Sequence, residues 1–151
     1  MQKLIFGSKV YNKEGKEIPI KNLVTQSGKT AFIIVFNRNQ NTKHACKVWS
    51  AKLEKHVKKG LKVYKILAFK SNMDELFKHS FENAINGFCC DFDEADILAM
   101  YGNCSRKIYN AAKCANDDTV AVAVFGEDKN LIFMHSEHYS EAAVKKLESA
   151  I

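Results

Sequence analysis

The sequence predicts an α/β protein in which helices cover both faces of a mixed sheet, forming a three-layer α/β/α sandwich. Residues 30–36 (TAFIIVF) form a continuous apolar run between polar residues, which indicates a strand buried on both faces. An amphipathic helix at 42–59 and a second strand at 63–69 follow, and such a unit forms a parallel pair with a right-handed crossover. The strands expected at 119–125 and 131–134 form a hairpin that adds to the same sheet.

Length and composition predict a single domain that spans residues 1–151. Of the 151 residues, 46% are hydrophobic, which is enough for one core, whereas two domains would each be undersized. The longest purely apolar run, residues 31–36, is much shorter than the roughly 20 residues that a membrane helix needs. No membrane association is therefore expected.

Two short strands are expected near the N-terminus, at 10–11 and 17–20, around a glycine-bearing turn at 12–16. Pro19 has no N–H group, so the second strand is expected at an edge of the sheet. This N-terminal β-hairpin precedes the first buried strand.

A helix is expected at 42–59, after a polar patch at 37–41. Thr42 can cap its N-terminus, and Gly60 can end it in a left-handed conformation. One helical stripe, which is expected to face the core while the lysines face solvent, consists of Cys46, Trp49, Leu53 and Val57.

A helical insert is expected between the second strand and the C-terminal hairpin. Residues 72–75 resemble a capping box that opens a helix, and residues 88–90 are expected to form a short strand. A further helix is predicted at 93–101 and is ended by Gly102, after which Ser105 caps a helix that runs through residue 112. Ser140 is expected to cap the last amphipathic helix.

The charge pattern predicts no nucleic-acid partner. The net charge is +6, but only two of the 23 basic residues, Arg38 and Arg106, are arginines, the residue type that forms bidentate contacts with phosphates and bases. Lysines gather between Lys43 and Lys70, at positions where a solvated helix face is the ordinary interpretation. The sequence contains no phosphate loop, dinucleotide fingerprint or zinc-ligand spacing, so no cofactor or metal is expected.

The cysteine pattern and the N-terminus bear on the compartment. The five cysteines are too widely and irregularly spaced for a small disulfide scaffold. Residues 1–7 are too short and too polar for a signal peptide, so the chain as written is expected in the cytoplasm. If a leader peptide has been removed and replaced by an initiator methionine, the protein is instead expected to be exported.

Several short phrases resemble the thioredoxin fold, and within it the redoxin and peroxiredoxin-like branch. Residues 28–36 (GKTAFIIVF) are similar to the entry into that family's active-site loop, and residues 97–102 (ILAMYG) resemble a helix end of peroxiredoxins. Residues 120–134 are similar to the family's closing hairpin. The resemblance covers most of residues 15–151, and it implies a thioredoxin-like fold and a thiol-based redox activity that needs no bound cofactor.

The sequence departs from the thioredoxin motif at both of its sulfur positions. In thioredoxins, a Cys-x-x-Cys motif places the first thiol at a helix N-terminus, where the free amides and the helix dipole stabilise the thiolate. Counted from Phe36, these two positions are Asn41 and His44, and neither carries sulfur. Dithiol exchange through this motif is therefore excluded.

The peroxiredoxin motif, Pro-x-x-x-Thr-x-x-Cys, is matched only in part. By the same count Thr42 matches the threonine that orients peroxide, Arg38 stands in place of the proline, and Ala45 stands in place of the cysteine. Cys46 lies one residue further on, and one residue of a helix turns a side chain by about 100°. Arg106 or Arg38 would have to supply the arginine that supports the peroxidatic thiolate.

Each cysteine has a functional and a structural interpretation. Cys46 lies near a helix N-terminus among basic residues, which would lower the pKa of its thiol, but it also shares the apolar stripe of Trp49. Cys89 and Cys90 could bond to each other, act as resolving thiols for Cys46, or pack in a short strand. Cys104 and Cys114 flank a helical segment, and a bond between them would need an oxidising compartment.

Two functions follow from these observations. In the first, the protein reduces peroxide or exchanges disulfides with a thiol or disulfide protein partner, with Cys46 as the reactive thiol, Thr42 as the orienting hydroxyl, and Cys89 or Cys90 as the resolving thiol. In the second, a thioredoxin-fold domain that has lost its redox motif acts as a binding module, either through the polar loop 37–41 or through its lysine-rich face. No oligomeric state is predicted.

Overall fold

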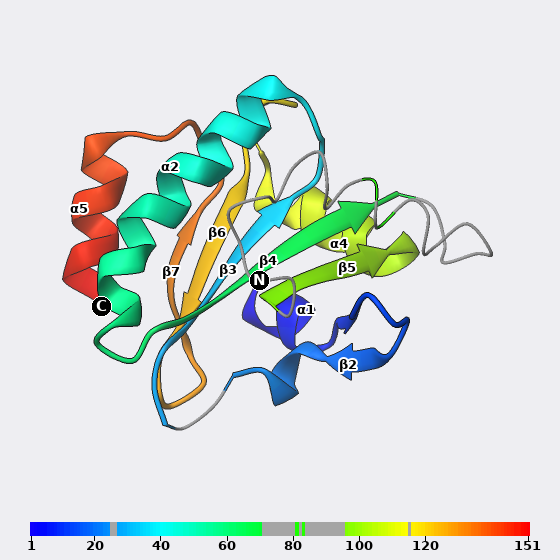
Figure 1. Cartoon of the computed structure of the whole chain (residues 1–151), viewed down its shortest axis with the longest axis horizontal. Coiled ribbons are helices and arrows are strands. Elements are labelled where there is room, and N and C mark those ends of the chain that lie inside the picture. Colours follow the sequence, from blue (N-terminus) through cyan, green and yellow to red (C-terminus); the bar gives the residue numbers. More distant parts are fainter. Residues whose placement is uncertain (25–26, 71–80, 82, 84–95, 115) are drawn as a thin grey trace.

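The computed structural model describes residues 1–24, 27–70, 81, 83, 96–114 and 116–151, and it contains a seven-stranded mixed sheet in the order β2-β1-β5-β4-β3-β6-β7 (Figure 1). The central strands β3, β4 and β5 are mutually parallel, and the outer strands pair antiparallel with their neighbours. The elements are α1 (Gln2–Phe6), β1 (Lys9–Tyr11), β2 (Glu17–Pro19), η1 (Ile20–Asn22), β3 (Thr30–Val35), α2 (Gln40–Val57), β4 (Lys62–Phe69), β5 (Ile97–Tyr101), α4 (Gly102–Ala112), β6 (Ala121–Phe125), β7 (Leu131–His135) and α5 (Glu141–Ala150).

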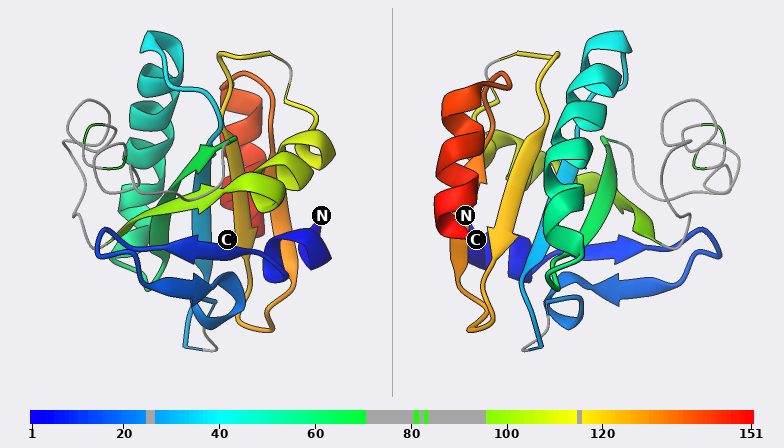
Figure 2. Two further views of the ribbon diagram at one scale, coloured as in Figure 1. Left: turned by 90° about the vertical axis from the view of Figure 1, so that its right-hand side faces the viewer. Right: turned by 60° about the vertical axis from the view of Figure 1, so that its left-hand side comes forward.

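Helices cover the sheet on both faces, as the sequence predicts, and the two faces have separate cores (Figure 2). The alternation of β3 divides its side chains between them: Ala31, Ile33 and Val35 pack beneath α2 and α5, whereas Phe32 and Ile34 pack beneath α1 and α4. Every residue of β3 is buried. This strand is therefore the centre of the three-layer sandwich.

The predicted parallel pair and the two hairpins are confirmed. β3 pairs in parallel with β4 from Thr30 opposite Lys62 onward, with α2 as the crossover. β6 pairs antiparallel with β3, and β7 then pairs with β6. The N-terminal hairpin of β1 and β2 lies at the far edge, and Pro19 is in the edge strand.

The helix predicted at 93–101 is wrong over the part that the structure describes. Ile97–Tyr101 is the strand β5, which pairs in parallel with β4, and its first four residues are buried. A short apolar run fits a buried strand and a buried helix equally well, so periodicity could not distinguish them. Gly102 therefore begins α4 instead of ending a helix, and Ser105 lies in the first turns of α4 instead of capping it.

The N-terminal helix is an element that the sequence analysis did not predict. The short helix α1 buries Ile5, and the ring of Phe6 stacks on that of Phe125 at 4.9 Å. The predicted capping box at 72–75 and the predicted strand at 88–90 fall outside the described residues. Of the predicted α2 stripe, Val57 is 46% exposed and is the one member that does not face the core.

Candidate functional site

The N-terminus of α2 lies at the end of β3, which is where the motif count places a redox centre. Asn39 caps the helix: its side chain accepts a hydrogen bond from the Thr42 amide at 2.9 Å, and its own amide donates to the Thr42 hydroxyl at 3.0 Å. This reciprocal arrangement is a capping box, so Thr42 is the third helical residue and not the cap. The Asn39 side chain also donates to the Asp117 carbonyl at 3.0 Å, which ties α2 to the loop before β6.

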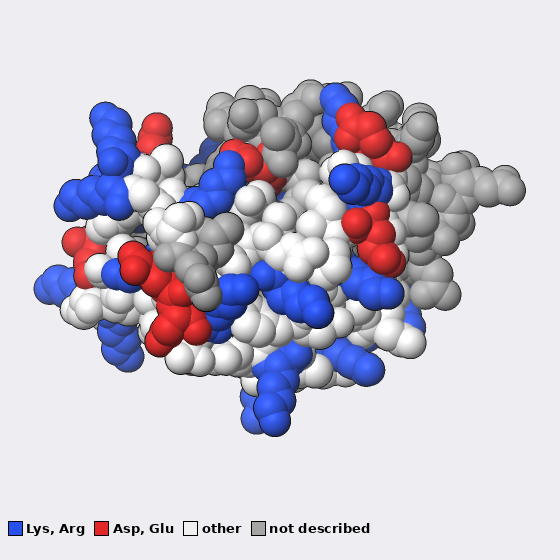
Figure 3. Space-filling view, turned by 90° about the horizontal axis from the view of Figure 1, so that it is seen from below, with Lys and Arg blue, Asp and Glu red and all other residues white. Residues whose placement is uncertain are grey.

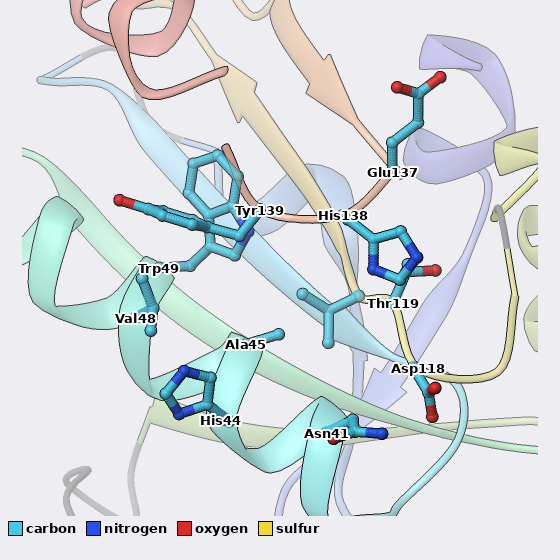
Figure 4. A pocket seen from close by; sticks show the side chains of 11 residues that line it. Asn41, His44, Ala45, Val48, Trp49, Asp118, Thr119, Glu137, His138 and Tyr139 are labelled. Carbon is cyan, nitrogen blue, oxygen red and sulfur yellow. The ribbon is translucent and has the colours of Figure 1, made fainter. Parts of the chain in front are cut away.

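A pocket of about 420 Å³ opens beside this helix end (Figure 4). Asn41 and His44, the two positions that carry sulfur in thioredoxins, both line it. The opposite walls come from the loop before β6, which includes Asp118, and from the loop before α5, which includes His138. Three segments that are distant in sequence therefore meet at the place where the family's redox motif would be.

Aromatic side chains close one side of this pocket, which we call the α2 pocket. The rings of Trp49 and Tyr139 lie edge to face at 5.3 Å, and His135 lies 5.4 Å from the same indole. Nε2 of His138 lies 2.9 Å from Nδ2 of Asn116, within hydrogen-bonding distance. The pocket therefore offers an aromatic surface together with hydrogen-bonding groups.

Cys46 does not open into the α2 pocket. Its side chain is 1% exposed and belongs to the core between α2 and the sheet, with Trp49 and Leu53. Burial raises the pKa of the Cys46 thiol, while the charge of Lys65 and hydrogen bonds from Lys65 and Ser50 act in the opposite direction. Burial is the largest of these effects, so the pKa of the thiol lies above its ordinary value.

Lys65 is a residue whose position the sequence analysis missed. It lies in β4 on the same face as Val63 and Leu67, is only 2% exposed, and interacts with Cys46. The lysine cluster between 43 and 70 was interpreted as solvated, and Lys65 is the exception. Its position in the middle of an apolar strand could have indicated burial, because side chains alternate between the two faces of a sheet and both faces are covered by helices.

The other groups that peroxide chemistry would need are engaged elsewhere. The Thr42 hydroxyl is buried and donates to the Asn39 carbonyl as well as accepting from the Asn39 amide. Arg38 donates to the Ala68 carbonyl at 2.9 Å and lies over the ring of Phe69 at 4.2 Å. Arg106 donates to the Lys70 carbonyl at 2.8 Å, on the other side of the sheet.

The other four cysteines fall into two groups, two that the structure describes and two that it does not. Cys104 and Cys114 are free thiols that pack against the core beneath α4. Burial raises the pKa of Cys114, against a hydrogen bond from Thr119. Cys89 and Cys90, the predicted resolving thiols, lie outside the described residues.

Neither a cluster of metal ligands in the described residues nor a continuous basic patch on the face seen from below (Figure 3) forms a second site. No group of three or more His, Cys, Asp or Glu side chains in that part of the chain could hold a metal ion. On the face shown in Figure 3, the basic side chains are separated by acidic and uncharged ones instead of forming one patch. No helix within the described ranges is long and apolar enough to cross a membrane.

Comparison with known proteins confirms the predicted fold. No family model matches the chain, and no curated protein matches its sequence. Solved structures do match: a thioredoxin-like protein from Porphyromonas gingivalis has a TM-score of 0.63 and 10% identity over 95% of this chain and 87% of its own. The chain therefore has a thioredoxin-like fold.

Two further matches indicate the range of proteins that share this fold. A secreted Mycobacterium tuberculosis disulfide oxidoreductase homologous to Escherichia coli DsbE has a TM-score of 0.58 and 8% identity, over 99% of this chain and 96% of its own. Arabidopsis thaliana ScoI with copper bound has a TM-score of 0.59 and 11% identity, over 96% of this chain and 99% of its own. The fold is thus one on which thiol–disulfide proteins are built, and at these identities the likeness shows the fold alone.

Proposed function

We propose that this chain is a redox-inactive thioredoxin-like domain that binds a protein partner through the α2 pocket. The observation that carries the proposal is the chemistry at the helix N-terminus. An amide and an imidazole, from Asn41 and His44, occupy the two sulfur positions, and Cys46, the next cysteine along the helix, is 1% exposed with a raised thiol pKa. A thiol in that state cannot attack a disulfide or a peroxide at a useful rate.

The lining of the α2 pocket supports binding. Its volume lies within the range of ligand sites, and its groups combine an aromatic wall with separate donors and acceptors. The half-buried ring of Tyr139, which packs edge to face on the fully buried Trp49, offers an aromatic contact, while His138 and Asp118 supply directional hydrogen bonds. We infer that polar side chains of a partner's segment enter here. This role requires no particular compartment, because no disulfide takes part in it.

A second candidate function is supported by one observation, the buried contact between Lys65 and Cys46. The ammonium group of Lys65 favours the thiolate, and a movement of α2 that exposed this pair would create an activated thiol. Cys46 would then reduce peroxide or exchange disulfides with a thiol protein, Cys89 or Cys90 would resolve the product, and Thr42 would have to leave its capping box in order to orient peroxide.

The experiment that separates the two functions restores the missing motif. In the reduction of insulin disulfides by dithiothreitol, we expect the native protein to give no acceleration and the double variant Asn41→Cys/His44→Cys to give a clear one. The control, Gln40→Cys/Lys43→Cys, has the same spacing but is rotated by about 100° around the helix, and we expect a much smaller gain from it.

Three outcomes would contradict the proposal. Acceleration by the native protein that disappears in Cys46→Ser would establish the second candidate function. Acceleration that persists in Cys46→Ser would assign a redox role to other cysteines. Equal acceleration by the two double variants would mean that positions 41 and 44 support thiol–disulfide exchange no better than other positions on the same helix end.

Binding itself is tested with an array of short peptides and the single tryptophan, Trp49, as the reporter. A peptide that occupies the α2 pocket should shift the indole emission, since Trp49 and Tyr139 form its aromatic wall. The shift should be lost in His138→Ala, and it should be retained in Lys107→Gln on α4. If both variants retain the shift, the peptide binds outside the α2 pocket.

A further inference from the structure

A second, smaller pocket lies on the opposite face of the sheet, beside α4. Its volume is about 220 Å³, and Phe36 and Ala68 line it from the ends of β3 and β4. Ser105, Arg106, Tyr109 and Asn110 line it from α4, and Lys70 lines it from the end of β4. Figure 2 shows α4 crossing the sheet on the face away from α2 and α5, so this α4 pocket is separate from the α2 pocket.

A buried hydroxyl in the α4 pocket is left without a partner. Ser105 is 3% exposed, and its Oγ makes no hydrogen bond to any residue that the structure describes. A buried polar group without a partner is costly, and folded proteins contain few of them. Because Ser105 lines the pocket, its hydroxyl is available to a ligand that enters.

Two cations stand at the rim of the α4 pocket. Arg106 is held in place by hydrogen bonds from Nη1 to the Lys70 carbonyl at 2.8 Å and from Nη2 to Oδ1 of Asn103 at 2.5 Å. Other N–H groups of this guanidinium stay available, because it has five in all. The Lys70 ammonium lies 5.9 Å from the centre of the Tyr109 ring. Among the described residues, those that line the pocket include two cations and no carboxylate, which favours a negatively charged ligand.

The floor of the α4 pocket is apolar and partly aromatic. The rings of Phe36 and Tyr109 lie edge to face at 5.2 Å with an interplanar angle of 70°, and the Ala68 methyl lies beside them. A fully hydrated ion such as inorganic phosphate would gain nothing from such a floor, whereas a flat apolar body would gain dispersion contacts and lose water from its surface.

We propose that the α4 pocket binds a small organic anion with a flat apolar body, of which an aromatic monocarboxylate is the simplest form. The ring packs against Phe36 and Tyr109, the carboxylate accepts hydrogen bonds from Arg106 and Lys70, and the Ser105 hydroxyl donates to one carboxylate oxygen. The volume equals that of about seven water molecules at roughly 30 Å³ each, which suits a ligand of this size. This inference does not depend on the α2 pocket or on the state of any thiol.

The test is a titration of the full chain with sodium benzoate, followed by the amide ¹H and ¹⁵N shifts of α4. We expect saturable shifts centred on Ser105, Arg106 and Tyr109. The affinity should fall by at least about tenfold in Ser105→Ala and in Arg106→Gln, since each loses a hydrogen bond to a charged group. The control Lys107→Gln, which removes one positive charge from the neighbouring exposed position, should leave the affinity unchanged.

Two neutral or inorganic probes check the chemistry. Benzyl alcohol has the ring without the charge, and phosphate has the charge without the ring, so each should bind at least about tenfold more weakly than benzoate. An absence of saturable benzoate shifts, an equal loss in Lys107→Gln, or full affinity in Ser105→Ala would overturn the proposal. Thermal unfolding of each variant establishes that it is folded. None of these results bears on thiol reactivity, so this proposal and the proposed function fail independently.

Discussion

The burial of Cys46 predicts how slowly its thiol reacts with an alkylating reagent. A reagent can reach this sulfur only when α2 lifts from the sheet, and that movement also exposes Trp49 and Leu53, which are fully buried. Re-exposing a side chain of leucine size costs about 1.5–3 kcal/mol, and tryptophan lies at or above the upper end. The opening therefore costs about 4–6 kcal/mol, which corresponds to a labelling rate about 10³ to 10⁴ times slower than that of an unfolded chain.

The assay is labelling by iodoacetamide at pH 7.5, read for each cysteine by peptide mass spectrometry and compared with the chain unfolded in urea. A Leu53→Ala variant should lower the cost of opening by at least about 2 kcal/mol and so accelerate the labelling of Cys46 by at least about 30-fold. The matched control is Val57→Ala in the same helix, since Val57 is 46% exposed and contributes little to docking.

Labelling of native Cys46 within about tenfold of the unfolded rate would refute this reasoning, because a rate so high requires a thiol with a path to solvent. It would also remove the main support for a redox-inactive site. An equal acceleration by Leu53→Ala and Val57→Ala would refute the narrower point that docking of the buried stripe controls access to the sulfur.

Three further predictions concern stability. Because burial raises the pKa of the Cys46 thiol, its contribution to the unfolding free energy is complete below the free-thiol pKa of about 8.5 and is lost as the pH rises above that value, by at most about 1.4 kcal/mol per pH unit. In urea unfolding between pH 7 and 10, the unfolding free energy should therefore fall less steeply with pH in Cys46→Ala than in the native protein. An equal dependence on pH in the two proteins would contradict this prediction. Asn39→Ala should destabilise the protein by about 1 kcal/mol through loss of the α2 cap, whereas Asn37→Ala, whose side chain makes only a 3.4 Å contact, should be nearly neutral in the same assay. Gly28→Ala should cost about 1–3 kcal/mol in thermal unfolding, because a Cβ atom there would lie 2.7 Å from the Gly60 carbonyl oxygen; a stability equal to that of the native protein would mean that the two loops can move apart easily.

Local sequence patterns were sufficient for most of the architecture. The apolar runs of β3 and β6 require burial on both faces, and the amphipathic stripe of α2 requires burial on one. The parallel pair, the closing hairpin and the layer order could therefore be predicted from them. The absence of sulfur at Asn41 and His44 was equally readable, because the helix N-terminus lies at a fixed distance along the chain from the end of β3.

The sequence by itself determined that Asn41 and His44 stand where thioredoxins carry sulfur, and the tertiary structure alone decided which side chains surround them. Whether Ile97–Tyr101 is a helix or a strand depended on pairing with β4, and whether Cys46 is exposed or buried depended on which side of α2 meets the sheet. The two pockets are assembled from loops and helix faces that are far apart in the chain. No local pattern encodes such meetings, because they follow from the packing of whole elements against one another.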